Sequence, residues 1–181
     1  MAEDASEDRR VQRTQQALRD AFFGLVLSRR YDDIKIADII EAAGVGRSTF
    51  YEHYQSKDDM LRRSMSYLFT VLADTITDAH DPSKLLFVIS HFWENRRFAS
   101  PMRTHPTQGI IVRALTDAFE HRLARRKTRL PAKLLAVQLA EGQMALLNAW
   151  LAGQASAPPE RVAETLAATA RAAVEAAREK I

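Results

Sequence analysis

The sequence predicts an all-α protein, and three observations indicate that class. Proline and glycine occur only six times each among the 181 residues, so few positions interrupt regular structure. Apolar residues recur at intervals of three and four, the spacing of one face of a helix. No segment alternates like a half-buried strand, no dipeptide marks a tight hairpin, and the sequence has no internal repeat. We therefore expect about nine helices joined by short turns.

The first two expected helices lie near the N-terminus. Residues 1–8 are polar and acidic, and we expect a disordered tail there, followed by a helix from about Arg9 to Ser28. Its apolar stripe consists of Val11, Leu18, Phe22, Leu25 and Val26. After a break at residues 31–33, a short second helix carries one apolar face at i, i+3, i+4 and i+7, formed by Ile36, Ile39, Ile40 and Ala43. Gly44 ends this helix because glycine readily adopts positive φ.

The remaining helices are placed by their caps and breaks. A short third helix spans about residues 47–53, and Ser56 can cap a longer fourth helix that continues to about Ala79. Later helices are expected over residues 82–93, 107–126, 131–153 and 159–180, with Pro101 and Pro106 as breaks. We place the boundary between an N-terminal three-helix domain, residues 9–60, and a C-terminal helical domain, residues 61–181.

Composition and charge limit the function classes only in part. The absence of cysteine excludes disulfides and thiolate zinc sites. The first ten residues lack the features of a signal peptide, and no apolar run approaches the roughly 18 residues of a membrane span, so we expect a cytoplasmic protein with no membrane partner. The net charge is +3, yet residues 1–60 contain nine basic and twelve acidic residues. Any DNA binding there must depend on a few well-placed cations rather than on bulk charge.

The most informative segment covers residues 34–57, IKIADIIEAAGVGRSTFYEHYQSK. Two short helices joined by a glycine-containing turn match a helix-turn-helix, whose second helix enters the major groove of DNA. With Phe50 packed inward, the polar residues of the second helix face outward, and Arg47 is the best base reader because its guanidinium can donate to both O6 and N7 of guanine. Tyr51 can donate to phosphate, and Lys57 begins the next helix, where backbone N–H groups favour a phosphate.

This segment is similar to the TetR-like family of bacterial regulators. The resembling positions are Ala17, Phe22, Tyr31, Asp38-Ile39, Ala43-Gly44-Val45, Thr49-Phe50-Tyr51, His53-Tyr54, Ser56-Lys57 and Leu61. The run RSTFYEHY looks like the subgroup in which Arg-Ser-Thr-Phe-Tyr opens the recognition helix. The resemblance covers about residues 10–62. It implies a homodimer formed through the last two helices, binding to a palindromic operator in double-stranded DNA, repression, and release of the DNA by a small-molecule effector.

The resemblance also assigns DNA contacts by position. They fall on Thr14, Lys35, Gly46, Arg47, Ser48, Thr49, Tyr51, His53 and Lys57. Three positions depart from the family pattern. Lys35 replaces a capping threonine, Gly46 replaces a capping serine at a cost of a few tenths of a kcal/mol, and Ile40 replaces an alanine and needs compensating space. These departures affect the fine contacts more than the fold.

The C-terminal domain is expected to supply dimerisation and ligand binding. Its last two helices have wide apolar faces that one small domain cannot easily bury, which predicts a two-fold interface containing Leu135, Leu139, Leu146, Leu147, Leu166 and Val174. The alternative is that these faces pack within the protomer. A ligand pocket is expected among Phe69, Phe92, Trp93, Met102, His105 and Trp150, although such residues are also typical of ordinary core. The basic run at 121–129 suits an anionic effector or the DNA backbone, and the alternative is a solvated connection between helices.

No cofactor, metal or catalytic motif is expected. The five histidines show no HExxH spacing, Gly44-Val45-Gly46 lacks the third glycine of a phosphate loop, and His91 with Glu94 makes only two metal ligands. We therefore predict a ligand-responsive DNA-binding repressor. One alternative is a TetR-like regulator that acts through a protein partner, or as an activator, without a small-molecule pocket. The other is a helical enzyme or binding module that merely contains the helix pair.

Overall fold

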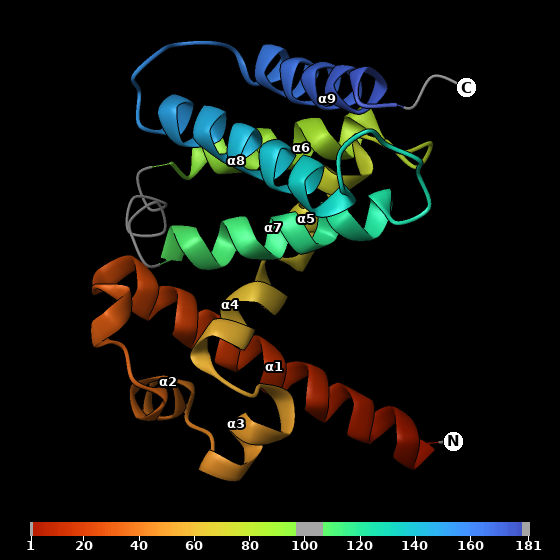
Figure 1. Ribbon diagram of the computed structural model, residues 1–181. Coiled ribbons are helices and arrows are strands. Elements are labelled where there is room, and N and C mark those ends of the chain that lie inside the picture. Colours follow the sequence, from red (N-terminus) through yellow and green to blue (C-terminus); the bar gives the residue numbers. More distant parts are fainter. Residues whose placement is uncertain (1, 97–106, 179–181) are drawn as a thin grey trace. The chain divides into compact units, whose positions relative to one another are not determined.

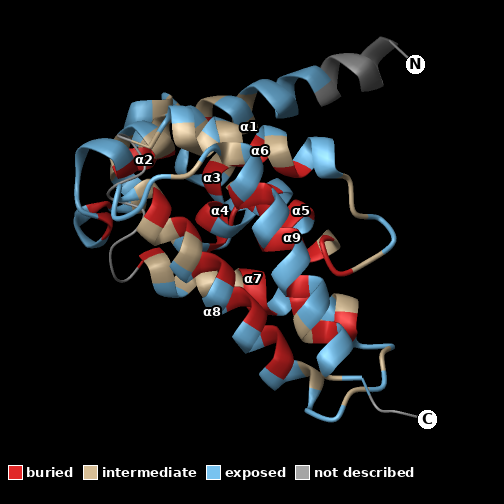
Figure 2. Cartoon of the chain, turned by 90° about the horizontal axis from the view of Figure 1, so that it is seen from above, coloured by how far each residue is buried: buried red, intermediate tan, exposed pale blue. Residues whose placement is uncertain are grey.

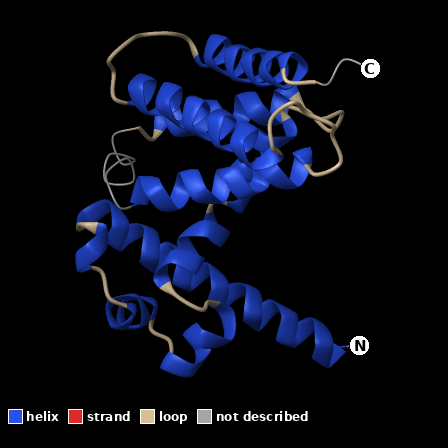
Figure 3. Cartoon of the chain, in the orientation of Figure 1, coloured by secondary structure: helices blue, strands red, loops and turns tan. Residues whose placement is uncertain are grey.

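The computed structural model describes residues 2–96 and 107–178, with side chains from residue 9 onward. Those residues form nine α-helices and one short 3-10 helix, with no strand beyond an isolated bridge between Thr128 and Arg178 (Figure 3). The predicted all-α class is confirmed. Within the same ranges, no helix has the length and apolar character needed to cross a bilayer. The chain divides into two compact units, Met1–Ser64 (unit 1) and Met65–Ile181 (unit 2). The division lies four residues beyond the boundary predicted after residue 60.

Unit 1 contains α1 (Ala2–Ser28), the 3-10 helix η1 (Tyr31–Asp33), α2 (Ile36–Ala43), α3 (Arg47–His53) and α4 (Lys57–Ser64) (Figure 1). The bounds of α2 and α3 are those predicted. The start of α1 is a correction, because the helix includes residues 2–8, where a disordered tail was expected.

The core of unit 1 is formed by one face from each helix. α1 packs on α2, and α2 packs on α3. The fully buried apolar side chains include Leu18, Phe22, Ile39, Phe50, Met60 and Leu61. The predicted stripe of α1 is correct at Leu18, Phe22 and Val26, whereas Val11 is 37% exposed. The short helices α2 and α3 therefore depend on tertiary packing, since isolated helices of this length are unstable in water.

Unit 2 contains α5 (Ser66–Asp74), α6 (Pro82–Glu94), α7 (Thr107–Leu123), α8 (Ala132–Leu151) and α9 (Pro159–Ala176). α7 packs against both α5 and α8, and α6 packs against both α5 and α9. Figure 2 marks the buried stripes of α7, α8 and α9 in red. The predicted breaks at Pro101 and Pro106 lie outside the described residues.

A single long helix from Lys57 to about Ala79 was wrongly predicted. The structure has α4 and α5 in its place, separated at Met65, whose backbone dihedrals of φ −101° and ψ 5° are not helical. Met65 is itself buried, as are Leu61 and Leu68 on either side. Apolar periodicity therefore continues across the break, which explains why the sequence pattern did not reveal it.

The apolar faces of α8 and α9 mostly pack inside the protomer. Five of the six residues predicted at the dimer interface are buried in the single chain: Leu135, Leu139, Leu147, Leu166 and Val174. Their side chains belong to the core of unit 2 and are at most 5% exposed, so they offer little surface to a partner, which corrects that prediction; Leu146 is half-buried. The large apolar side chains that α8 does expose are Leu134 at 56% and Val137 at 40%.

The basic run at 121–129 is in part structural. The Arg122 guanidinium pairs with Asp74 at 2.9 Å, and Arg126 donates to the carbonyl of Ile76 at 2.6 Å. Arg129 donates to the carbonyl of Arg178 at 3.1 Å. These contacts tie the α7–α8 connection to the ends of α5 and α9, so part of this basic charge already has a partner within unit 2.

Candidate nucleic-acid interface

The turn between α2 and α3 is built around Gly44. Its φ of 65° and ψ of 33° lie in the left-handed region, which glycine adopts without the steric cost that other residues pay. The Gly44 amide donates to the carbonyl of Glu41 at 3.1 Å, and the Val45 amide donates to the carbonyl of Ile40 at 3.2 Å. These bonds satisfy the carbonyls at the end of α2 and turn the chain within two residues. Gly46, the N-cap of α3, has φ −76° and requires no glycine.

Phe50 fixes which face of α3 is exposed. Its side chain is fully buried, and its ring lies 5.8 Å from the ring of Tyr54, which is also buried. Tyr54 follows Phe50 by four positions and therefore lies on the same inward side. Arg47, Ser48 and Tyr51 are exposed on the remaining surface of α3, and Thr49 is half-buried. The helix thus presents a guanidinium and several hydroxyl groups on one surface.

Arg47 and Tyr51 contact each other on that surface. The guanidinium carbon of Arg47 lies 5.7 Å from the centre of the Tyr51 ring, within cation–π range. Tyr51 is 46% exposed and packs edge-on against Phe50, with ring centroids 5.4 Å apart. Within the described part of the chain, Arg47 has no hydrogen bond or ion pair. Its five N–H donors are therefore available to a bound partner.

Lys35 precedes α2 as its N-cap and leaves its ammonium group exposed. The Lys35 side chain cannot accept the capping hydrogen bond, and the Asp38 carboxylate makes only the reciprocal contact, by accepting from the Lys35 backbone N–H at 2.7 Å. The lysine side chain has no acceptor among the described residues and stays available for a phosphate. Thr14 is half-buried on α1.

Lys57 has a structural role that the sequence did not suggest. Its Nζ donates to the carbonyl of Tyr31 at 2.7 Å and to the carbonyl of Ile34 at 2.9 Å. The same nitrogen lies 4.3 Å from the centre of the Tyr31 ring. Two of its three donors are thus used within unit 1, and the expectation of a free phosphate-binding cation is corrected accordingly.

Tyr31 and Asp58 complete this structural cluster. The Tyr31 hydroxyl donates to the Asp58 carboxylate at 2.5 Å, and burial together with that carboxylate raises the pKa of Tyr31 far above its ordinary value. The tyrosine was known from the sequence only as a resembling position. Nothing local signals the contact, because 27 residues separate the two side chains.

His53 lies at the end of α3 and is half-buried. Its Nδ1 is 3.5 Å from Nε2 of Gln15, so a weak polar contact joins α3 to α1. Gln15 was not predicted as a site residue. Its contribution is to position His53 and the last turn of α3.

Four of the six residues predicted to line a ligand pocket lie in the described part of unit 2. Trp93 and Trp150 stack face to face with ring centroids 4.5 Å apart, and Trp150 Nε1 donates to the carbonyl of Ala157 at 2.9 Å. Phe69 is buried core, and Phe92 is half-buried on α6. Neither of the two surface cavities described for this unit is lined by any of these four residues. Met102 and His105 lie outside the described residues.

No group of three acidic or histidine side chains within residues 2–96 and 107–178 is arranged to hold a metal ion. His91 instead stacks on the exposed ring of Phe87, with centroids 6.5 Å apart.

The α2–α3 geometry is that of a helix-turn-helix, and known proteins resemble the chain over this segment and beyond it. Residues 26–63 match the family model described as "Bacterial regulatory proteins, tetR family". The HTH-type transcriptional regulator YxbF of Bacillus subtilis is 35% identical over 78 residues, which is 42% of this chain and 20% of that protein. The dhaKLM operon transcriptional activator DhaS of Lactococcus lactis is 31% identical over 90 residues, 47% of this chain and 46% of that protein. The chain thus spans less than half the length of either relative.

Solved structures extend the likeness beyond the N-terminal unit. A TetR transcriptional regulator from Streptococcus agalactiae aligns over 92% of this chain and 98% of its own, with 25% identity and a TM-score of 0.58. A TetR-family regulator from Streptomyces coelicolor aligns over 91% and 96% with a TM-score of 0.62, and its 18% identity supports the fold alone. The chain thus resembles TetR-family regulators in fold, and its residues 26–63 match the model of that family. The relatives named here are transcriptional regulators rather than enzymes.

Proposed function

We propose that this protein is a sequence-specific DNA-binding transcriptional regulator that acts as a homodimer on a palindromic operator. The observation that carries the proposal is the exposed face of α3. Phe50 anchors the helix, while Arg47, Ser48 and Tyr51 are exposed and have no side-chain hydrogen bond within the described chain. A guanidinium held in this way suits bidentate donation to guanine in the major groove.

Unit 1 also supplies the groups that we expect to contact DNA phosphates. Lys35 presents a free ammonium, and Thr14, Ser48, Thr49 and Tyr51 offer hydroxyl donors. We expect His53 to contact a phosphate as well. The backbone N–H groups at the start of α3, next to Gly46, are further donors. Such contacts set the position on the duplex and carry little sequence information.

Dimerisation is proposed through exposed side chains of α8 rather than through its buried stripe. Leu134 and Val137 are the large apolar side chains that α8 leaves exposed, and they lie one turn apart. A two-fold axis beside them would give a self-complementary contact. The dimer would set two reading helices about one DNA turn apart, roughly 34 Å.

Repression relieved by a small ligand is the mode of action that we propose for unit 2. The competing mode is activation, or action through a protein partner. Two observations favour this second candidate. The rings of Trp93 and Trp150 stack directly on each other, which leaves no room for a ligand between them, and the related DhaS is a transcriptional activator. Transcription from a promoter carrying the operator, with and without the regulator, distinguishes the two.

Selection of random duplex DNA by the purified protein tests the proposal. We expect an enriched palindrome, and Arg47→Ala is expected to reduce discrimination by about 1–3 kcal/mol at one base position of each half-site. Arg29→Ala serves as the matched control, because Arg29 is also exposed in unit 1 but lies outside α3. Absence of enrichment at low salt, or an unchanged preference in Arg47→Ala, contradicts the assignment of α3 as the reading helix.

A further inference from the structure

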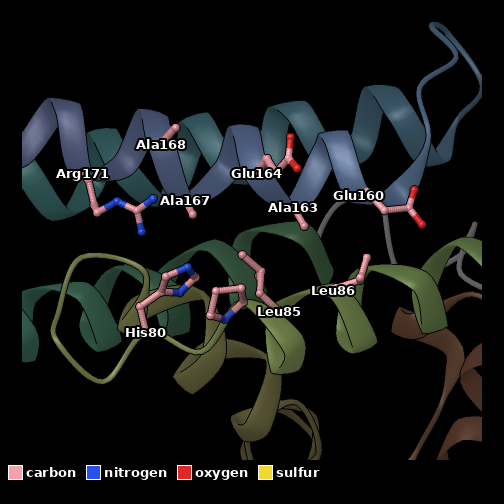
Figure 4. Close-up of a pocket in the computed structure, with 10 residues that line it drawn as sticks. His80, Leu85, Leu86, Glu160, Ala163, Glu164, Ala167, Ala168 and Arg171 are labelled. Atoms are coloured by element: carbon pink, nitrogen blue, oxygen red, sulfur yellow. The ribbon is translucent and has the colours of Figure 1, made fainter.

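A groove lies between the start of α6 and the length of α9, in unit 2 (Figure 4). Its volume of about 430 Å³ is in the range of small-molecule sites. Leu85 and Leu86 line it from α6, and Ala163, Ala167 and Ala168 line it from α9. Because these alanines end at Cβ, α9 cannot fill the space along the leucines, so the sequence leaves an apolar trough there.

The two ends of the groove differ in charge. His80 and Arg171 face each other at one end, and Glu160 and Glu164 belong to the other (Figure 4). Seven residues of α9 separate Glu164 from Arg171, a rise of about 10 Å. The groove therefore has the length of a short aliphatic chain and a cationic group at one end.

The acidic end already has compensation for its charge. Glu164 pairs with Arg161 at 3.0 Å, and Glu160 lies in the first turn of α9, where the helix dipole stabilises an anion. Arg171 differs, since it has no ion pair or hydrogen bond within residues 2–96 and 107–178. The neighbouring carboxylate of Asp81 is occupied, because it caps α6 by accepting from the backbone N–H groups of Ser83 and Lys84.

We propose that this groove binds a small organic monoanion, with its carboxylate on Arg171 and His80 and its aliphatic body along Leu85, Leu86 and Ala167. A guanidinium and an imidazole supply convergent donors for a carboxylate. The acidic far end disfavours a second negative charge, so the preferred ligand has one anionic end only. The inference names a ligand class for the regulator proposed above and rests on that proposal for its biological meaning; the binding itself does not depend on DNA.

Binding should be coupled to proton uptake by His80. Burial and then the Arg171 charge lower the pKa of this histidine, while Asp81 and Asp74 raise it by less. The imidazole is therefore neutral near pH 7. A bound carboxylate favours the imidazolium, so affinity should increase as the pH falls toward the pKa of His80.

Octanoate is the probe, titrated into the full-length protein and followed by NMR of the alanine methyl groups and the His80 imidazole. We expect saturable shifts at His80, Ala163 and Ala167, with no comparable binding of octylamine. Arg171→Gln should weaken octanoate by about tenfold or more, since it removes a charge-assisted contact. Ala168→Leu should weaken it by filling the groove, and Arg178→Gln, near the end of the same helix but outside the lining, should not. His80→Gln should remove the increase in affinity at lower pH.

Three outcomes would overturn the proposal: no saturable binding at millimolar octanoate, equal or tighter binding of octylamine, or unchanged affinity in Arg171→Gln. Circular dichroism of each variant shows whether the fold is kept, and Ala168→Leu is the second variant should Arg171→Gln lose it. Binding of the selected operator is measured on the same samples. If the protein binds its operator but not octanoate, only the proposed ligand of the groove is wrong. If it binds octanoate but no DNA, the groove assignment stands and the proposed regulatory function is wrong.

Discussion

Lys57 and Lys35 both belong to unit 1, but their ammonium groups have different surroundings. Lys57 donates to the carbonyls of Tyr31 and Ile34 and lies over the Tyr31 ring, whereas Lys35 has no described acceptor. We expect Lys57→Ala to lower the free energy of unfolding by about 1–3 kcal/mol, because two carbonyls lose a charged donor. Lys35→Ala should change it by no more than about 0.5 kcal/mol. Urea unfolding of both variants measures the difference.

The same pair separates structural from DNA-binding roles. Lys35→Ala should weaken all DNA sequences similarly and reduce the slope of log affinity against log salt by about one unit, as expected for one lost phosphate contact. If Lys57→Ala instead leaves stability intact and alone reduces the salt slope, the structural role assigned to Lys57 is wrong.

The role of a residue could be predicted from the sequence where its side chain acts without a distant partner. Arg47 is exposed on α3 as its position implied, and Phe50 is buried. Lys57 was misjudged because its partners are backbone carbonyls 26 and 23 residues away, and no local pattern encodes such contacts. The groove residues were missed for the same reason, since Leu85 and Arg171 come together only when α6 packs on α9.

The turn between α2 and α3 offers a test at the scale of a structural element. Gly44→Ala should lower the free energy of unfolding by about 1 kcal/mol, because alanine is strained at a φ of 65°. Gly46→Ser should raise it by a few tenths of a kcal/mol, because serine can cap α3 and an added Cβ meets nothing nearer than 3.7 Å. Chemical unfolding of the two variants should therefore shift the midpoint in opposite directions. Equal destabilisation by both would show that the turn tolerates no side chain at either position.

Element boundaries followed the strength of the local signal. Gly44, with its positive φ, ends α2 where predicted, and the Asp81-Pro82 pair begins α6 where predicted. The break at Met65 contains neither glycine nor proline. Met65 is also buried, as it would be if one continuous helix presented the same apolar face. Local chemistry therefore fixes capped ends, whereas packing decides where an apolar helix is interrupted.

At the scale of the whole molecule, the apolar content of α8 is divided between the protomer core and a small exposed part. Leu135, Leu139 and Leu147 are at most 5% exposed in the single chain, whereas Leu134 is 56% exposed. Amphipathic periodicity identified the buried stripe correctly but assigned it to the wrong partner, since the sequence cannot tell whether a helix face is covered by the same chain or by another. The expectation of a dimer therefore moves to Leu134 and Val137.

Leu134→Glu combined with Val137→Glu tests that placement. Two charges on the proposed contact should disfavour association, so sedimentation should show a larger monomer fraction than in the original protein. The stability of each protomer should change little, because both side chains lie on the exposed face. Leu139→Ala is the contrasting variant and should cost about 2–5 kcal/mol of unfolding free energy, as expected for truncation of a buried leucine. Operator binding adds the functional readout: the double variant should lose affinity for the full palindrome while retaining that for a half-site. A double variant that remains dimeric would place the interface elsewhere on the molecule.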